Sequence, residues 1–473
     1  MTRDTIGPIA LAAKLPVGFR LGVATAAIQV EGGAEERGVA GWDVFAAQAG
    51  RILDGSTPAV TADHFHRWRE DVRLIREAGL DAYRFSISWP RVQPTGSGSL
   101  NAAGMDWYER LVDELLAAEI RPMATIHHWD TPSELDARGG WAARETAERL
   151  GELAGLLGER IGDRIAEWVT VNEPATVTLD GYALGLHSPG RAELFKAIPV
   201  ARNLLLGHGL AAQALRAAGV AGRIGIVNVH TPVTPATDSR ADRAMAKTFD
   251  LVHNRLFADP VHLGRTPSVR GLPLPLQLVL WPQLRWSSAD LRVISQPLDF
   301  VGLNYYFPSR IAAGPDTGEW SPDGEAEAMK DVPFHFAAWP EAETTAFGWP
   351  VVPRGLADTM RELSDRYPDL PPVIVTEGGA SFHDELRPDG SVDDERRVAY
   401  LASHLEVAAE VASGAIHGID LEGYFVWSLL DNWEWAAGFT QRFGVVHVDF
   451  DTGERTPKAS WRYLRDVQRA RRG

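Results

Sequence analysis

The feature that most constrains the fold is a repeating alternation of short apolar runs with longer amphipathic stretches. The runs are rich in β-branched residues and too short for helices, whereas the stretches between them have helical periodicity. Strands that alternate with helices form parallel βα units, and eight such units can close into a barrel. The sequence predicts strands at Phe19–Thr25, Ala82–Ser88, Arg121–His127, Glu167–Asn172, Arg223–Val229, Leu298–Asn304, Val373–Thr376 and Gly423–Ser428.

Helices are expected between these strands, and the pattern is weakest around the fifth and sixth strands. There a Pro-rich segment, 260–285, interrupts the period. No linker, low-complexity block or tandem repeat divides the chain. The predicted fold class is therefore α/β, with one (β/α)8 TIM-barrel domain over residues 1–473 and loop insertions at the C-terminal face. The expected helices are His64–Ala78, Trp107–Ala118, Ala142–Leu157, Ala201–Ala218, Arg354–Tyr367 and Asp394–Ala412.

Charge and composition exclude several classes of partner. A formal net charge of −16 would repel nucleic acid, and the absence of cysteine excludes disulfides and thiolate chemistry. No apolar run is long enough to cross a bilayer, so we expect no membrane partner. The mildly apolar start, Ile6–Ala13, follows Arg3, but Asp4 spoils the positive flank of a signal peptide. A cytoplasmic location is expected, and nothing in the pattern indicates an oligomeric state.

Unusual polar residues gather where the predicted strands end. In a β/α barrel the C-terminal ends of the strands meet at one face, where active sites assemble. The sequence therefore predicts a site at this face. Its candidates, in chain order, are Gln29 and Glu31, Arg84, His128 with Trp129 and Asp130, Asn172 with Glu173, Asn304 with Tyr306, Glu377 and Trp427.

Two of these candidates are carboxylates at the ends of apolar strands, Glu173 and Glu377. Burying a carboxylate there is costly unless it is paired or functional. Two-step cleavage of a glycosidic bond needs two carboxyls about 5–5.5 Å apart, one as nucleophile and one as acid and base. Arg84 and the Tyr306 hydroxyl could hold Glu377 ionised, and its charge would then keep Glu173 protonated. A pair of structural salt bridges is the alternative.

Seven ordered motifs resemble those of glycoside hydrolase family 1. The resemblance covers about Phe19 to Trp461 and is carried by ATAAIQVEGG (24–33), DAYRFSISWPR (81–91), HHWDTP (127–132), TVNEP (170–174), DFVGLNYY (299–306), VIVTEGG (373–379) and WSLLDNWEWAAGFTQRFGVVHVDF (427–450).

The resemblance implies a retaining β-glycosidase that acts on a small β-glycoside or a short oligosaccharide and needs no cofactor. The expected activity is that of an exo-acting β-glucosidase, which removes terminal non-reducing β-D-glucosyl residues, with β-galactosidase or β-fucosidase side activity. The resemblance also implies that Glu377 is the nucleophile and Glu173 the acid/base, with Arg84, Asn172 and Tyr306 as the other catalytic groups. Asn172 would bind the sugar 2-hydroxyl, Gln29 and His128 the 3-hydroxyl, and Glu434 the 4- and 6-hydroxyls. The remaining expected substrate-binding residues are Trp427 as the stacking floor, Trp435, Trp129, Asn304, Phe443 and, at the aglycone entrance, Trp349.

Three positions depart from the family pattern. Gly378 follows the nucleophile where Asn is usual, which puts in doubt the backbone conformation beside Glu377. Leu21 replaces a usual Trp and Ile28 a usual Tyr, and both are interpreted as packing changes.

Other interpretations are disfavoured by particular residues. His127 and His128 are adjacent on a strand and point to opposite faces, so we expect no metal site. A 6-phospho-β-glycosidase is the main alternative, but Glu434 would repel the phosphate. A catalytically inactive sugar-binding protein is another, but both catalytic Glu residues are present. No phosphate-binding or dinucleotide motif supports an unrelated barrel enzyme.

Overall fold

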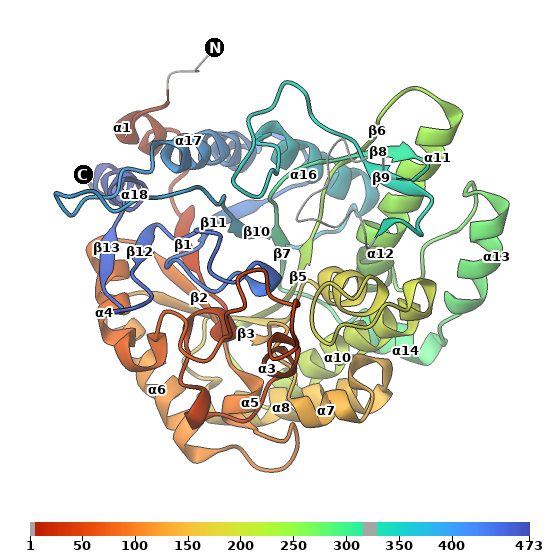
Figure 1. Cartoon of the computed structure of the whole chain (residues 1–473), viewed down its shortest axis with the longest axis horizontal. Coiled ribbons are helices and arrows are strands. Elements are labelled where there is room, and N and C mark those ends of the chain that lie inside the picture. The colour runs from red at the N-terminus through yellow and green to blue at the C-terminus, as the bar shows by residue number, and fades with distance from the viewer. Residues whose placement is uncertain (1–4, 316–328) are drawn as a thin grey trace.

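Eight parallel strands close a barrel in the computed structural model, which describes residues 5–315 and 329–473 (Figure 1). Around the barrel the strands follow the order β1-β11-β10-β7-β5-β4-β3-β2. The predicted fold class is thus confirmed, and each predicted strand overlaps one that is observed. Their bounds are β1 Arg20–Ala24, β2 Ala82–Ser86, β3 Arg121–His127, β4 Glu167–Asn172, β5 Arg223–Val229, β7 Phe300–Asn304, β10 Val373–Gly378 and β11 Leu421–Trp427.

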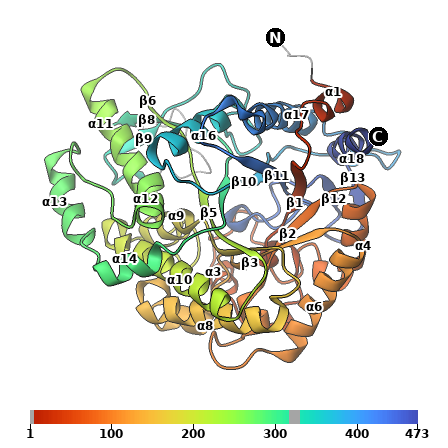
Figure 2. The same cartoon turned by 180° about the vertical axis from the view of Figure 1, so that it is seen from behind.

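Helices cover the outside of the barrel, as both views show (Figures 1 and 2). The six predicted helices are confirmed with shifted ends; the largest shift at a start is that of α6, which begins at Ala102. These helices bury their apolar stripes against the strands. They are α4 His64–Glu77, α6 Ala102–Ala117, α8 Arg144–Ile161, α10 Ile198–Ala217, α16 Arg354–Arg366 and α17 Glu395–Glu410.

The segment between β5 and β7 holds helices that the sequence pattern did not predict. A π-helical turn, η5, adds a residue to the turn and shifts the apolar period. Pro260 and Pro282 lie inside two of the helices, and α13 is apolar almost all round. The apolar period of the sequence therefore does not indicate these helices, although they form. Their bounds are α11 Arg240–Phe249, η5 Asp250–Arg255, α12 Leu256–Leu263, α13 Leu274–Gln283 and α14 Ser288–Ile294.

Additional strands extend the C-terminal face of the barrel. A three-stranded sheet is built from segments that follow β5 and β7, namely β6 Val233–Pro235, β8 Ser309–Ala313 and β9 Phe334–Phe336. A two-stranded sheet follows β11 and consists of β12 Val446–Val448 and β13 Arg455–Pro457. These strands belong to the predicted insertions, and residues of β8 and β9 line the cavity described below.

The barrel interior is filled by side chains. Phe300 and Phe425 lie inside it together with aliphatic residues from the other strands. Two glycines make room for these rings: a Cβ on Gly22 would lie 2.7 Å from the ring of Phe425, and one on Gly225 would lie 2.7 Å from that of Phe300. The interior is thus a packed core, and an open site can lie only above it.

The first helix, α1 (Pro8–Ala12), lies beside the last one, α18 (Ala459–Arg472) (Figure 1). The Tyr463 hydroxyl donates a hydrogen bond of 2.9 Å to the carbonyl of Ile6. Among the described residues no helix has the length and apolar character needed to span a membrane.

A charge network joins the N-terminal ends of the strands at the opposite face of the barrel. Glu167, at the start of β4, is fully buried. It accepts hydrogen bonds from Arg20 at the start of β1 and from Arg121 at the start of β3, the latter at 3.0 Å. Arg223 at the start of β5 lies 3.6 Å away. One buried carboxylate therefore pairs with the first residues of three strands.

We predict that Glu167→Gln lowers the free energy of unfolding by about 2–3 kcal/mol, because it leaves the arginines without their buried partner. The matched control is Glu422→Gln. Glu422 also pairs with Arg20 and Arg223, but its side chain is 26% exposed, so its loss should cost about 1 kcal/mol or less. Urea unfolding followed by tryptophan fluorescence measures both variants. An equal loss of unfolding free energy in the two variants would contradict the prediction that Glu167 contributes more than Glu422.

Candidate active site

Both candidate carboxylates lie where their strands depart from regular pairing. Glu173 directly follows β4, whose pairing with β5 shifts register between Val169 and Asn172. Glu377 lies near the end of β10, whose pairing with β7 shifts between Val375 and Glu377. A bulge next to a strand end turns the side chains that follow it. The two irregularities therefore set the direction of the two carboxylates.

Glu377 is an ion-paired and hydrogen-bonded carboxylate. Arg84, on β2 and 1% exposed, donates to its Oε1 at 2.5 Å. The Tyr306 hydroxyl donates to its Oε2 at 2.6 Å. Burial and the neighbouring Glu377 carboxylate raise the pKa of Tyr306 well above its usual value, so the phenol keeps its proton and remains a donor. Both contacts favour the ionised form of Glu377.

Glu173 has the opposite character. Burial, and then the charge of Glu377, raise its pKa to about 8. Asn304 donates to its Oε1 at 2.5 Å and Thr176 to its Oε2 at 2.7 Å, and both bonds act against this rise. At neutral pH the site thus holds one carboxylate and one carboxylic acid, the arrangement that acid catalysis beside a nucleophile requires.

Asn172 connects Arg84 with a buried histidine. Its Oδ1 accepts from Arg84 at 2.7 Å and from Asn304 at 3.2 Å, so its Nδ2 must point the other way, 3.1 Å from Nε2 of His128. Burial and the positive charge of Arg84 hold the pKa of His128 well below its usual value. The imidazole is therefore neutral, with Nε2 as the acceptor and the proton on Nδ1.

Two polar atoms near this network are buried without a hydrogen-bond partner among the described residues, Nδ1 of His128 and Oε1 of Gln29. The amide nitrogen of Gln29 is fully used. It donates to Asn432 at 2.9 Å, to the carbonyl of Trp433 at 3.0 Å and to Glu434 at 3.2 Å. A buried donor and a buried acceptor left unpaired are costly, and both would be satisfied by a ligand that carries hydroxyl groups.

Aromatic rings form the rest of the surface near the carboxylates. The His128 ring is stacked between those of Trp427 and Trp435, each with its centroid 5.9 Å away. Trp129 lies 4.4 Å from Trp435 and donates from its indole to the carbonyl of Asn172 at 3.0 Å. Flat rings of this kind suit the C–H faces of a sugar.

These residues surround a cavity of about 880 Å³. Some of the predicted site residues do not line this cavity, namely Glu31, Arg84, Gln29, Asn172 and Asn304. The last four of these form hydrogen bonds with residues that line the cavity or with each other. Phe443 does not line it either; its ring packs 5.9 Å from that of Trp349. The predicted site residues that line the cavity are His128, Trp129, Glu173, Tyr306, Trp349, Glu377, Trp427, Glu434 and Trp435.

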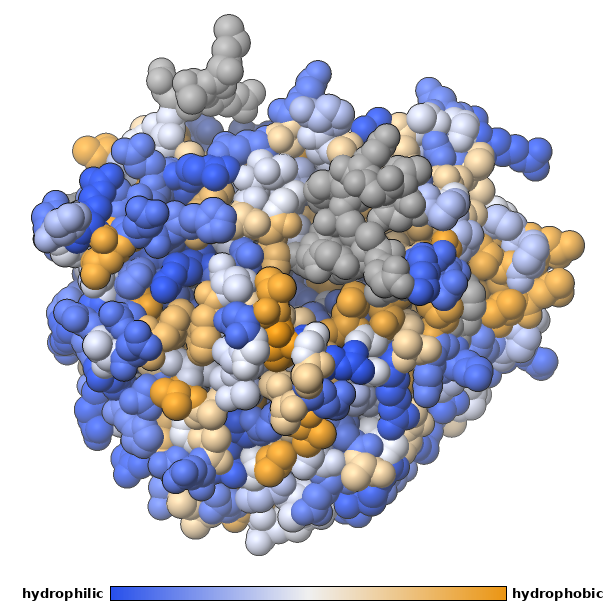
Figure 3. Space-filling model, viewed as in Figure 1, coloured by the Kyte–Doolittle hydropathy of each residue, from blue (hydrophilic) through white to orange (hydrophobic). Residues whose placement is uncertain are grey.

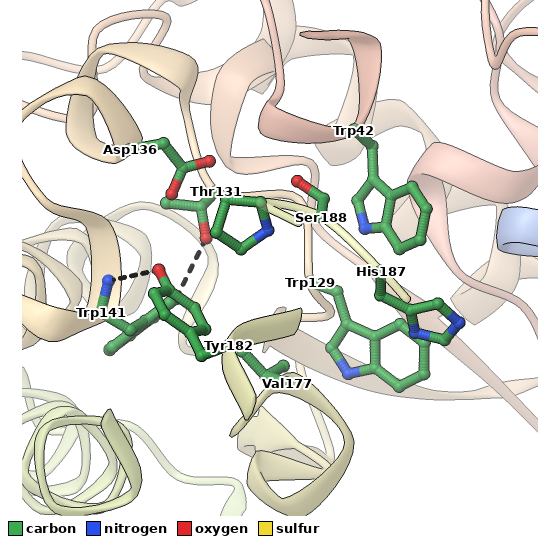
Figure 4. A pocket seen from close by; sticks show the side chains of 10 residues that line it. Trp42, Trp129, Thr131, Asp136, Trp141, Val177, Tyr182, His187 and Ser188 are labelled. Atoms are coloured by element: carbon green, nitrogen blue, oxygen red, sulfur yellow. Dashed lines mark hydrogen bonds between the residues drawn. The ribbon is translucent and has the colours of Figure 1, made fainter. Parts of the chain in front are cut away.

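A much smaller cavity, of about 10 Å³, lies behind Trp129 (Figure 4). Trp42 and His187 lie on the Trp129 side of it, and Tyr182 accepts a hydrogen bond from the backbone of Trp141 on the other. Its volume suits about one water molecule and no sugar. The small cavity therefore belongs to the support of Trp129.

The two adjacent histidines, at the end of β3 and directly after it, point in different directions, as the sequence predicts. His127 contacts Thr131 through Nε2 at 3.1 Å, whereas His128 faces Asn172. Over residues 5–315 and 329–473, no group of three or more His, Cys, Asp or Glu side chains is placed to hold a metal ion.

Three supporting residues were not singled out from the sequence. Thr176 holds Glu173, Thr376 donates to Oδ1 of Asn304 at 2.8 Å, and Asn432 holds Gln29. All three lie within or just after the motifs quoted above. Their closeness in sequence to the predicted site residues was the signal that could have identified them.

The presence of glycine at position 378 has a steric explanation, which differs from the expected change in backbone conformation. It continues β10 and does not adopt a positive φ. A Cβ at this position would lie 2.1 Å from the hydroxyl of Tyr424. Tyr424 thus occupies the space that a side chain at position 378 would need.

An eight-stranded barrel that presents a carboxylate and a carboxylic acid beside sugar-sized aromatic surfaces defines a glycosidase. The family model of Glycosyl hydrolase family 1 matches residues 11–472. The chain therefore belongs to this family of retaining glycosidases.

Individual relatives agree along the whole chain. β-Glucosidase A of Thermotoga maritima is 38% identical over 96% of this chain and 97% of its own length. A bifunctional β-D-glucosidase/β-D-fucosidase of Bifidobacterium breve is 37% identical over 95% and 97%. The crystal structure of a psychrophilic β-glucosidase from Micrococcus antarcticus aligns with a TM-score of 0.89 at 40% identity, covering 98% of this chain and 99% of the other.

We predict that the carboxyl of Glu173 titrates with a pKa of about 8, and that Glu377→Gln lowers this value because it removes the negative charge that opposes ionisation. Carbon-detected NMR titration of glutamate-labelled protein measures both. Glu434→Gln is the matched control, since it removes the same charge from the same cavity and should move the titration less. An unchanged Glu173 pKa in Glu377→Gln would contradict the coupling.

Proposed function

We propose that the protein is an exo-acting β-glucosidase, which hydrolyses terminal non-reducing β-D-glucosyl residues through a covalent glycosyl-enzyme. The observation that carries this proposal is the pair of buried carboxyls with different surroundings, Glu377 held by Arg84 and Tyr306, and Glu173 with a pKa that burial and the charge of Glu377 raise. The names of the relatives support the glucosyl specificity, and that of the Bifidobacterium breve relative supports a β-fucosidase side activity.

In the first step Glu377 attacks the anomeric carbon while Glu173 gives its proton to the leaving oxygen. The Glu377 carboxylate becomes an ester, so the charge that kept Glu173 protonated is gone. Glu173, now ionised, takes a proton from water, and the water oxygen displaces Glu377 from the sugar. The two inversions together retain the β configuration.

The polar network is proposed to bind the sugar. Nδ1 of His128 would donate to a hydroxyl, and Oε1 of Gln29 would accept from one, which satisfies the two buried atoms that lack partners. Asn172 would donate its second N–H to the 2-hydroxyl, Glu434 would accept from the 4- and 6-hydroxyls, and Trp427 would form the stacking floor. Glu434 also disfavours a phosphorylated sugar, since two negative groups would meet.

The whole chain, 1–473, is proposed to act as one catalytic domain, because the barrel strands run from Arg20 to Trp427 and the family model extends beyond both ends. The cytoplasmic location stays a prediction, which cell fractionation tests.

We predict that Glu377→Ala lowers kcat on p-nitrophenyl β-D-glucoside by roughly 10⁴-fold or more, because no covalent intermediate forms. Added azide should restore release of nitrophenol and yield α-glucosyl azide. Glu173→Ala is the matched contrast: there azide should attack the glycosyl-enzyme and yield the β-azide. Azides of the same configuration from both variants would contradict the assignment of the two roles.

We also predict that kcat/KM on phenyl β-D-glucoside falls on the basic side near pH 8, where Glu173 loses the proton it must donate. Thr176→Val removes a hydrogen bond that favours ionised Glu173, so the basic limb should move to higher pH. Thr178→Val is the control, since Thr178 donates to the carbonyl of Pro174 instead and should leave the limb in place.

A further inference from the structure

Six charged side chains lie together between the loops that follow β10 and β11 and the start of α18. Three are cations and three are carboxylates, and five of the six side chains are at most 2% exposed. The surface over α17 and α18 is mostly hydrophilic (Figure 3), whereas most of these six charges are buried. We call them the charge cluster, and none of its members lines the large cavity: Asp384, Asp394, Arg397, Asp431, Arg442 and Lys458.

Lys458, which directly precedes α18, joins two loops at the mouth of the barrel. Its Nζ donates to Asp384, in the loop after β10, at 2.5 Å. The same atom donates to Asp431, in the loop after β11, at 2.7 Å. One buried ammonium therefore ties the loop that follows the nucleophile Glu377 to the loop that carries Glu434.

Asp431 is held between cations. Besides the contact with Lys458, Arg442 donates to its Oδ2 at 2.7 Å, and the backbone N–H of Gly444 donates to its Oδ1 at 2.9 Å. Burial opposes the charge of Asp431, but Lys458 and then Arg442 hold the pKa of this carboxyl below its usual value. A buried charge of this kind is stable only while it is paired, so the position of Asp431 depends on its cations.

The residues that follow Asp431 hold the proposed sugar-binding groups. Oδ1 of Asn432 accepts from the side-chain amide of Gln29 at 2.9 Å, and the carbonyl of Trp433 accepts from it at 3.0 Å. The backbone N–H of Trp433 donates in turn to the carbonyl of Gln29 at 3.1 Å. Glu434 comes next and accepts from the same amide at 3.2 Å. A shift of Asp431 would therefore move the groups proposed to bind the 3-, 4- and 6-hydroxyls.

Removal of the Lys458 ammonium would affect its two carboxylate partners differently. Asp384 would keep its ion pair with Arg397, a fully buried side chain 2.7 Å away. Asp431 would keep the pair with Arg442, whose side chain is 24% exposed and is therefore a weaker partner. The loop after β11 is thus the one whose position depends on Lys458.

The catalytic nucleophile is held by other contacts. Glu377 is bonded by Arg84 on β2 and by Tyr306 after β7. Neither residue belongs to the charge cluster or to the loop after β11. Loss of Lys458 should therefore change how the sugar is recognised more than how its bond is cleaved.

We propose that Lys458 is a positioning residue for sugar recognition. It acts through Asp431 and holds the loop after β11 where Glu434 and Gln29 meet the sugar hydroxyls. The proposal rests on the β-glucosidase function proposed above and adds a residue that determines its specificity from outside the cavity.

The test compares kcat/KM of the full-length wild type and Lys458→Met on p-nitrophenyl β-D-glucoside and on its 6-deoxy and 2-deoxy analogues. The ratio of the glucoside to the 6-deoxy analogue should fall about tenfold in the variant, because the hydrogen bond to the charged Glu434 is weakened. The ratio to the 2-deoxy analogue should stay within about twofold, since Asn172, proposed to bind the 2-hydroxyl, is held by Arg84. An unchanged 6-deoxy ratio, or an equal fall of both ratios, would overturn the proposal.

Arg455→Met is the matched control. Arg455, on β13, is also a fully buried cation, and it pairs with Asp71 on α4 at 2.9 Å. Its loss should lower the unfolding temperature about as much as that of Lys458, because each leaves a buried carboxylate short of a partner. The 6-deoxy ratio should stay unchanged, since Asp71 lies on α4 and not on the loop after β11. Assays are made well below the unfolding temperature of each variant, and an equal fall of the 6-deoxy ratio in both would overturn the proposal.

Asp431→Asn gives the same readout if Lys458→Met does not fold. It keeps the shape of the side chain, removes the charge that Lys458 holds and leaves Lys458 paired with Asp384. This variant should also lower the 6-deoxy ratio, and an unchanged ratio would overturn the proposal.

The wild type separates the proposal from the function on which it rests. Hydrolysis of p-nitrophenyl β-D-glucoside with no preference over its 6-deoxy analogue overturns the role of Lys458 alone. No hydrolysis of any β-glucoside overturns the β-glucosidase function.

Discussion

The buried guanidinium of Arg84 is the interaction on which the site depends. A full positive charge at the top of a packed barrel is tolerable only if it is paired and hydrogen-bonded. Arg84 meets this condition by contacts to Glu377, to Asn172 and to Thr125 on three other strands. The ion pair keeps Glu377 charged, and that charge with burial keeps Glu173 neutral. One pairing thus sets the protonation states of both carboxyls and the direction of Asn172.

The walls of the cavity follow from the circular order of the strands. Residues after β1, β3, β4 and β11 supply amides, an imidazole, a carboxylate and indoles around Glu377. The long insertions after β5 and β7 supply much of the remaining wall, including Phe249, Leu256 and Phe334. The two carboxyls therefore lie in a cavity whose walls come from both the barrel mouth and these insertions.

Much of this architecture could be predicted from the sequence because the barrel is regular. Strands buried on both faces are continuous apolar runs, and the catalytic groups stand at their ends in ordered motifs. The helices between β5 and β7 were missed because a π-helical turn and internal prolines break the period on which the prediction depends. The steric explanation for glycine at position 378 could not be predicted either, because Tyr424, which fills the space of a side chain there, is distant in sequence. The outer wall of the cavity depends on how several insertions meet, which no local pattern contains.

Three residues of the site have a strained backbone conformation. Glu173, Trp129 and Trp435 all have positive φ, a conformation that costs a non-glycine residue about 1 kcal/mol or more. Each follows a barrel strand or the turn after it, and a rigid barrel can hold such residues because the pairing below them is fixed. The carboxylates cannot shift without disturbing that pairing.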